Sequence, residues 1–365
     1  MILFDILGYK LFKSMGRPMR GPLSLSLAVT HRCNSRCLTC NIWNKNNDND
    51  ELTADEYGTV FRGFKKPPLE LILTGGEPFI REDMADICKR AIEYLKPKII
   101  VIPTNGILTG KICEDIEKIL DSSVKTHIVV NVSLDGVKKD NDLIRGREDS
   151  FERAIGTYSA LRKIRNRLLS VKIHTVISSY NVDKIMETYK YVREELKTNL
   201  YIVEIAQGRS ELYNRIIERT ITPSLQKYSR VINLLSKQLV KEKFSGLSGI
   251  IQAFRLEYYR LSQRILEAQK KIIPCYAGFA SAQIMPNGDI CFCATQADTI
   301  GNLRESGYSF EKIWLSDRAK NARARSKKST CYCVLANMAY INMLHDAGSL
   351  FRIILRSRKF GHEVS

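Results

Sequence analysis

The sequence lacks an apolar run of about twenty residues, a cleavable signal, an internal repeat and a low-complexity tract. We therefore expect neither a membrane-spanning helix, nor an exported scaffold of disulfides, nor a disordered chain. The 365 residues are 44% hydrophobic, which is enough for one large domain plus a smaller one. A globular protein of the cytoplasm is the expectation.

Acidic residues are scarce relative to basic ones, with 39 Asp or Glu against 57 Lys or Arg and a formal charge of +18. Such an excess indicates an anionic partner. Nucleic acid, an anionic membrane, a protein electron donor and an acidic substrate all remain open, with nucleic acid the less favoured. Much of the excess lies in residues 208–274 and in the tail 349–360.

The ten cysteines are spread unevenly, in two clusters rather than along the whole chain. Metal binding in a reducing compartment explains this pattern better than disulfides do. Cys88 and Cys113 lie alone in helix-like stretches, where we expect buried apolar thiols.

The first cluster is Cys33, Cys37 and Cys40, directly after a strand-like run. One short loop with this spacing can supply three ligands to a cube of four irons, which leaves the fourth iron with an open position. A closed zinc site with His31 as fourth ligand is the alternative.

Three further motifs follow this loop, each at the end of an apolar run: Gly75-Gly76-Glu77-Pro78, Thr104-Asn105-Gly106 and Asn131-Val-Ser-Leu-Asp-Gly136. With the cysteine loop, and in this order, they resemble the radical S-adenosylmethionine (SAM) enzymes over roughly residues 23–206. The resemblance implies a 4Fe-4S cluster on the three cysteines, SAM on the open iron, and one-electron cleavage of SAM to a 5′-deoxyadenosyl radical. It also implies a flavodoxin- or ferredoxin-type electron donor.

The resemblance assigns SAM contacts to these motifs. Gly75 and Gly76 would let the backbone approach a ligand, with Pro78 completing the turn, and Glu77 would accept a hydrogen bond from the SAM ammonium. An ordinary turn between strand and helix is the alternative. Arg32 and Arg36 flank the thiols, where they would either help hold a reducible cluster or be solvated loop charges.

Polar residues alternate at the end of the fourth strand. Asn131, Ser133 and Asp135 share one face because side chains in a strand alternate, and this face would point into the barrel. In the family such groups, and Asn105, meet the carboxylate or ribose of SAM; simple turns remain the alternative for Asp135 and Asn105. His174 would either face the substrate or be a structural residue.

Strand-like runs alternate with helical ones, which predicts a parallel sheet with crossover helices. Six such units match the partial (β/α)6 TIM barrel that the resemblance implies, an α/β fold with its chemistry at the carboxyl ends of the strands. The expected strands are 25–29, 69–73, 98–102, 126–132, 171–177 and 200–205, and the expected helices are near 53–64, 82–96, 108–121, 150–166 and 182–197.

The second cysteine group is Cys275, Cys291, Cys293, Cys331 and Cys333, with a predicted hairpin turn at residues 286–289. It resembles a SPASM or twitch auxiliary domain, although Cys331-Tyr-Cys333 replaces the family's Cys-x-x-Cys. We expect one auxiliary 4Fe-4S cluster on Cys275, Cys293, Cys331 and Cys333, with Cys291 the doubtful ligand. A structural zinc is the alternative.

The predicted domains are an amphipathic helix at 1–22, the radical SAM barrel at 23–207, a basic helical insertion at 208–274, the auxiliary domain at 275–335 and a basic helical tail at 336–365. The stripe Leu3, Leu7, Leu11 and Met15, together with residues 350–359, predicts contact with an anionic membrane surface. Packing within the protein is the alternative.

The substrate is left open by the sequence. The basic amphipathic ends favour a lipid-linked or phosphorylated small molecule. A peptide is less favoured because only about twenty residues precede the first strand, too few for a leader-binding domain. The positive charge would also suit an enzyme that modifies RNA, and the cysteines alone would also suit a non-enzymatic iron–sulfur or zinc module.

Overall fold

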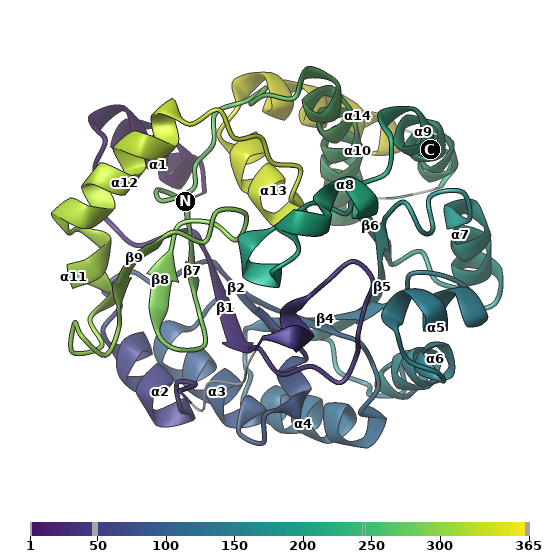
Figure 1. Ribbon diagram of the computed structural model, residues 1–365, viewed down its shortest axis with the longest axis horizontal. Helices are drawn as coiled ribbons and strands as arrows, with labels where there is room; N and C mark the ends of the chain where they lie inside the picture. The colour runs from purple at the N-terminus through teal and green to yellow at the C-terminus, as the bar shows by residue number, and fades with distance from the viewer. Residues whose placement is uncertain (1, 46–49, 243, 245, 362–365) are drawn as a thin grey trace.

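Six parallel strands form the framework of the molecule (Figure 1). The computed structural model describes residues 2–45, 50–242, 244 and 246–361. Hydrogen bonds join neighbours in the order of the chain, which confirms the expected partial barrel. The strands are β1 (Ser24–Thr30), β2 (Glu70–Gly75), β3 (Ile99–Thr104), β4 (His127–Ser133), β5 (Leu169–Ile177) and β6 (Tyr201–Ile205).

Helices cover the outside of this sheet and bury its apolar side chains. Thr53 and Glu56 form the capping box that begins the first of them. The crossover helices are α2 (Ala54–Arg62), α3 (Met84–Arg90), α4 (Thr109–Asp121), α6 (Ser150–Leu161) and α7 (Ile185–Glu194). A π-helical turn, Ala91–Leu95, extends α3, and α5 (Lys139–Arg145) is a helix that the sequence analysis did not predict.

The auxiliary segment continues the barrel sheet beyond β1. Strand β7 (Ser281–Ile284) pairs in parallel with β1, and β8 (Asp289–Cys291) and β9 (Thr299–Asn302) follow as antiparallel neighbours. Helices α11 (Phe310–Trp314) and α12 (Asp317–Lys328) then return over this edge (Figure 1). Strand β7 therefore joins the auxiliary segment to β1, the strand that leads into the first cysteine loop.

The remaining helices lie between β6 and β7, on the side that six strands leave open (Figure 1). The short α8 (Glu218–Ile221) leads into a pair of helices, α9 (Leu225–Lys241) and α10 (Gly246–Ala268). Helices α13 (Ala336–Leu344) and α14 (Ala347–Gly361) pack beside α10. The buried carboxylate of Glu257 in α10 binds Arg352 and Arg356 of α14 at 2.9 and 3.4 Å.

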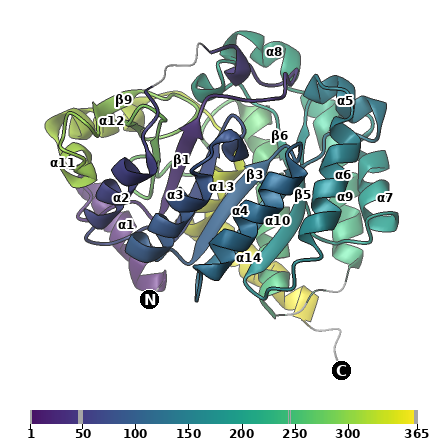
Figure 2. The same cartoon turned by 90° about the horizontal axis from the view of Figure 1, so that it is seen from below.

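Helix α1 (Ile2–Met15) packs through a different face from the predicted stripe. Ile6, Tyr9 and Phe12 are buried, whereas Leu7 and Leu11 are each 55% exposed. The inward face meets aromatic residues far away in sequence, which periodicity alone cannot reveal. Helices α1 and α14 lie at the end of the barrel opposite the first cysteine loop (Figure 2). No described helix is long and apolar enough to cross a membrane.

Candidate active site

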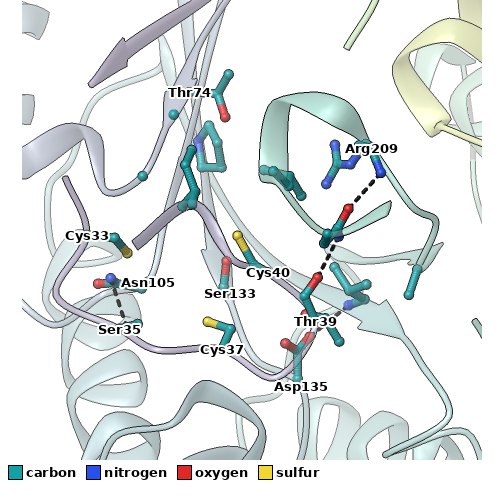
Figure 3. Close-up of a pocket in the computed structure, with 18 of the residues that line it drawn as sticks. Cys33, Ser35, Cys37, Thr39, Cys40, Thr74, Asn105, Ser133, Asp135 and Arg209 are labelled. Carbon is teal, nitrogen blue, oxygen red and sulfur yellow. Dashed lines mark hydrogen bonds between the residues drawn. The ribbon is translucent and has the colours of Figure 1, made fainter. Parts of the chain in front are cut away.

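The first cysteine loop lies over the carboxyl ends of the barrel strands. Cys33, Cys37 and Cys40 line one cavity, and their sulfur atoms face the space that Ser133 and Asp135 also border (Figure 3). Burial raises the pKa of Cys33 and of Cys40 to about 12, so these thiols are protonated at neutral pH until a metal displaces the protons.

The paired glycines hold this loop against the sheet. A Cβ on Gly75 would lie 2.2 Å from the carbonyl oxygen of Thr30, and one on Gly76 would lie 2.0 Å from that of Arg32. Gly75 also has φ of +134°, which side chains disfavour. The amide of Gly76 donates to Thr30 O at 2.8 Å. The absence of side chains at these glycines therefore lets the end of β2 lie against the start of the cysteine loop. The sequence predicted that the same absence would let the backbone approach a ligand.

Helix α5 holds the loop from the other side. The amides of Arg36 and Leu38 donate to the carbonyls of Arg145 and Ile144 at 3.1 and 2.9 Å. At Gly146, where φ is +60°, a Cβ would lie 2.1 Å from Arg36 O. The loop is thus fixed by backbone contacts on both sides.

Glu77 is fully buried and already well supplied with donors. Its carboxylate accepts from the Thr104 hydroxyl at 2.8 Å and from the amides of Asn105 and Phe79 at 2.7 and 3.3 Å. Burial raises the pKa of Glu77 to about 7 despite these bonds. The side-chain amide of Asn105 in turn donates to Asn34 Oδ1 at 2.7 Å. Asn105 therefore contacts the cysteine loop directly, and Glu77 acts through the backbone of Asn105.

A partly buried cation, Arg145, lies beside the thiols, whereas the sequence pointed to Arg32 and Arg36. Arg145 binds Asp135 at 2.8 Å and lies 4.0 Å from the sulfur of Cys37. Arg32 instead pairs with Glu51, and Arg36 lies over the ring of Trp43. Sequence reasoning missed Arg145 because it belongs to the unpredicted helix α5.

The second cysteine group surrounds another cavity. Cys275, Cys293, Cys331 and Cys333 all line it, together with residues of α12. Cys291 does not line it: this residue is buried within β8, where burial raises the pKa of its thiol. The geometry thus separates four cysteines from the fifth.

Neither cysteine group resembles a preformed site for a single ion. Among the described residues, no three His, Cys, Asp or Glu side chains converge as a mononuclear site requires. His31 packs edge-on against Tyr213 and does not line the first cavity. Thiols that border a shared space without converging fit a cube of irons, whose ligands lie farther apart.

Comparison with protein families supports the same conclusion. Residues 27–192 match the Radical SAM superfamily, and residues 275–334 match the iron-sulfur cluster-binding SPASM domain. The chain belongs to the radical SAM superfamily. It is an enzyme of this class, with a 4Fe-4S cluster that works with SAM and an auxiliary iron–sulfur cluster in its SPASM domain.

Individual relatives differ in activity. The radical SAM chain is 29% identical to a GTP 3′,8-cyclase of Clostridium perfringens over 247 residues, 63% of this chain and 72% of that protein. It is 25% identical to the subtilosin biosynthesis protein AlbA of Bacillus subtilis over 304 residues, 79% of this chain and 58% of that one.

Solved structures share the fold. Streptococcus suis SuiB bound to SAM has a TM-score of 0.62 at 18% identity, over 86% of this chain and 70% of SuiB. The protein anSMEcpe with bound SAM and a peptide has a TM-score of 0.59 at 14% identity, over 93% and 99% of the two chains.

A third cavity, of about 370 Å³, lies inside the barrel of this radical SAM enzyme. Asn131, Lys172 and His174 line it, so the polar face predicted for β4 does point inward. It shares Arg209 with the first cysteine cavity and Cys293 with the second. The barrel cavity therefore borders both cysteine sites.

Residues 207–214 connect the two sites, a role that no motif had indicated. The amide of Ser210 donates to Thr295 O at 3.1 Å in the auxiliary domain, and the Asn214 side chain donates to Thr39 O at 2.8 Å in the first loop. Arg209 binds Glu211 at 3.1 Å and borders the first cavity (Figure 3). The connecting role of this segment could have been predicted only if the positions of the auxiliary strands had been known.

Proposed function

We propose that Cys33, Cys37 and Cys40 hold the 4Fe-4S cluster, and that a substrate in the barrel cavity gives up a hydrogen atom. With the cluster and SAM bound, reductive cleavage supplies a 5′-deoxyadenosyl radical that takes this hydrogen. The observation that carries the proposal is the barrel cavity, which opens toward both cysteine sites. A flavodoxin- or ferredoxin-type protein would deliver the electron.

The chain's own residues would orient SAM in the first cavity. The residues that border it include Ser133, Asp135 and the segment 75–77, and these would contact the amino acid or ribose part. Glu77 and Asn105 would act mainly by fixing the loop, because their side chains already bind Thr104 and Asn34.

For the auxiliary cluster we propose Cys275, Cys293, Cys331 and Cys333 as ligands. These four side chains share a cavity that the buried Cys291 does not reach. Residues 207–214 would hold this cluster at a fixed position relative to SAM, because they bond to both cysteine-bearing segments.

The reacting part of the substrate would be polar but not a polyphosphate. Three carboxylates line the barrel cavity, from Glu70, Glu204 and Glu211, against the cations Lys172 and Arg209. Arg209 is already paired with Glu211. A triphosphate needs several unpaired cations, so the excess of carboxylates over cations in this cavity disfavours GTP. If the substrate is phosphorylated, as the sequence predicted, its phosphate would lie outside the barrel.

A peptide side chain or another uncharged or zwitterionic group suits such a cavity better. Peptides are bound in solved neighbours of the same fold. GTP added to the reduced, iron-loaded enzyme together with SAM should not increase the formation of 5′-deoxyadenosine. GTP-dependent formation of 5′-deoxyadenosine would contradict this proposal.

We also propose that the end of the barrel opposite the cysteine loop contacts an anionic membrane surface. Leu7 and Leu11 of α1 are each 55% exposed, and Phe351 and Ile354 of α14 are 63% and 51% exposed. Both helices lie at this end (Figure 2), and α14 carries exposed basic side chains such as Arg358. Each basic residue near such a surface contributes about 1 kcal/mol, and salt screens it.

Sedimentation with vesicles tests this contact. Wild-type protein should pellet with anionic vesicles and less with neutral ones, and Leu7→Gln with Leu11→Gln should weaken the binding. Leu143→Gln is the matched control, because Leu143 is 68% exposed but lies in α5 beside the cysteine loop. Equal pelleting with neutral and anionic lipid would exclude the contact.

A further inference from the structure

A cavity lined by basic side chains lies outside the barrel, beside Cys275. This cavity of about 330 Å³ is lined by Lys13 of α1, by residues 271–275, 277 and 279, and by Arg323, Ser326 and Lys327 of α12. Among the described residues, its lining contains four cationic side chains, those of Lys13, Lys271, Arg323 and Lys327, and no Asp or Glu. Its size is that of small-ligand sites, about 300–1,000 Å³.

The hydrogen bonds of these cations fix their positions without cancelling their charge. Lys13 donates to Cys275 O at 2.8 Å, and Lys271 donates to the carbonyls of Ser326 and Ser329 at 2.9 and 2.8 Å. Arg323, which is buried, donates to carbonyl oxygens as well. All these acceptors are backbone carbonyls in the described part of the chain, so the positive charges are held close together without a carboxylate.

Such an arrangement is unfavourable without an anion. Like charges line one cavity with no carboxylate in its described lining, so they repel one another. A bound dianion would remove this repulsion and accept charge-assisted hydrogen bonds from the lysines.

We propose that this cavity binds a phosphate or diphosphate group. The group can belong to a soluble phosphate ester or to a lipid head group, because Lys13 shares helix α1 with the exposed side chains of Leu11 and Met15. The site is separate from the barrel cavity, so its binding of phosphate does not depend on which substrate the barrel takes.

Calorimetric titration with inorganic pyrophosphate into the iron-loaded protein tests the site. Wild type should bind saturably, and Lys327→Met should bind at least about tenfold more weakly, since a charge-assisted hydrogen bond is lost. Lys327 makes no hydrogen bond that fixes the described fold, so the variant should keep its iron and its stability. The control is Lys320→Met, an exposed residue of the same helix that does not line the cavity, and it should bind as wild type does.

Vesicles of phosphatidylcholine with and without phosphatidate distinguish the two sources. Pelleting that requires phosphatidate and is competed by pyrophosphate supports a lipid head group, and pyrophosphate binding without pelleting supports a soluble ester. Equal pyrophosphate binding by Lys327→Met and Lys320→Met would overturn the proposal. So would loss of auxiliary iron in Lys327→Met with unchanged pyrophosphate binding, because the cations would then serve only the cluster.

Discussion

Replacing Gly76 with Ala tests whether the glycine pair acts by seating the cysteine loop. The new Cβ would lie 2.0 Å from Arg32 O and 2.9 Å from His31 O, whereas real Cβ atoms essentially never come within 3.0 Å of such atoms. The loop must therefore move away from β2 by about 1 Å. That movement disrupts the bonds from Gly76 N to Thr30 O at 2.8 Å and from Glu77 N to Arg32 O at 2.9 Å.

The expected cost combines two effects. Two lost hydrogen bonds cost about 1 kcal/mol each, and the overpacking costs about 1–3 kcal/mol more. We expect the free energy of unfolding of the metal-free protein to fall by about 3–5 kcal/mol in urea denaturation, and the variant to hold less iron. Gly156→Ala is the control, because its Cβ meets open space within α6 and should stabilise the protein by about 1 kcal/mol. A Gly76→Ala protein with wild-type stability, iron content and SAM cleavage would refute the reasoning.

Three further predictions concern other parts of the structure. Iron analysis of single variants should show that Cys293→Ala loses the auxiliary cluster and Cys291→Ala keeps it; the reverse would mean that the ligand assignment is wrong. Arg145→Gln leaves the carboxylate of Asp135 buried without its cation, and urea denaturation should show a loss of about 3–5 kcal/mol; unchanged stability would contradict this role of Arg145. The hydrogen bond from Arg304 lowers the pKa of Glu56 to about 2. The stability that Glu56 contributes is therefore present above its ordinary pKa of 4.5 and is lost as the pH falls toward 2. A metal-free Glu56→Gln protein should lack this part of the acid dependence, and a pH profile identical to that of wild type would contradict it.

The sequence predicted those parts of the site that lie at strand ends. The carboxyl ends of parallel strands meet at one edge, so motifs after β1, β2, β3 and β4 had to converge once the alternation was recognised. Ser133 and Asp135 accordingly border the first cavity, as the period of a strand requires. The turn between β7 and β8 could also be predicted, because a hairpin turn depends on residues that are adjacent in the sequence.

Features that depend on distant contacts could not be predicted in this way. Arg145 lies in a short helix whose role depends on the loop that it contacts. Arg209 borders the first cavity on a segment whose next residue, Ser210, bonds to the auxiliary domain. The stripe with Leu7 and Leu11 faces outward because Tyr9 and Phe12 find apolar partners in the segment around Ala280 and in α13. Periodicity shows that a helix has an apolar face, but not which face its neighbours will cover.

Formation of 5′-deoxyadenosine tests the central claim most directly. Anaerobically reconstituted and reduced protein should bind roughly eight irons, in two four-iron clusters, and should cleave SAM. The variant with Cys33, Cys37 and Cys40 all replaced by Ala should lose one cluster and all of this cleavage. Reduced wild type that makes no 5′-deoxyadenosine, or a triple variant that still makes it, would contradict the account.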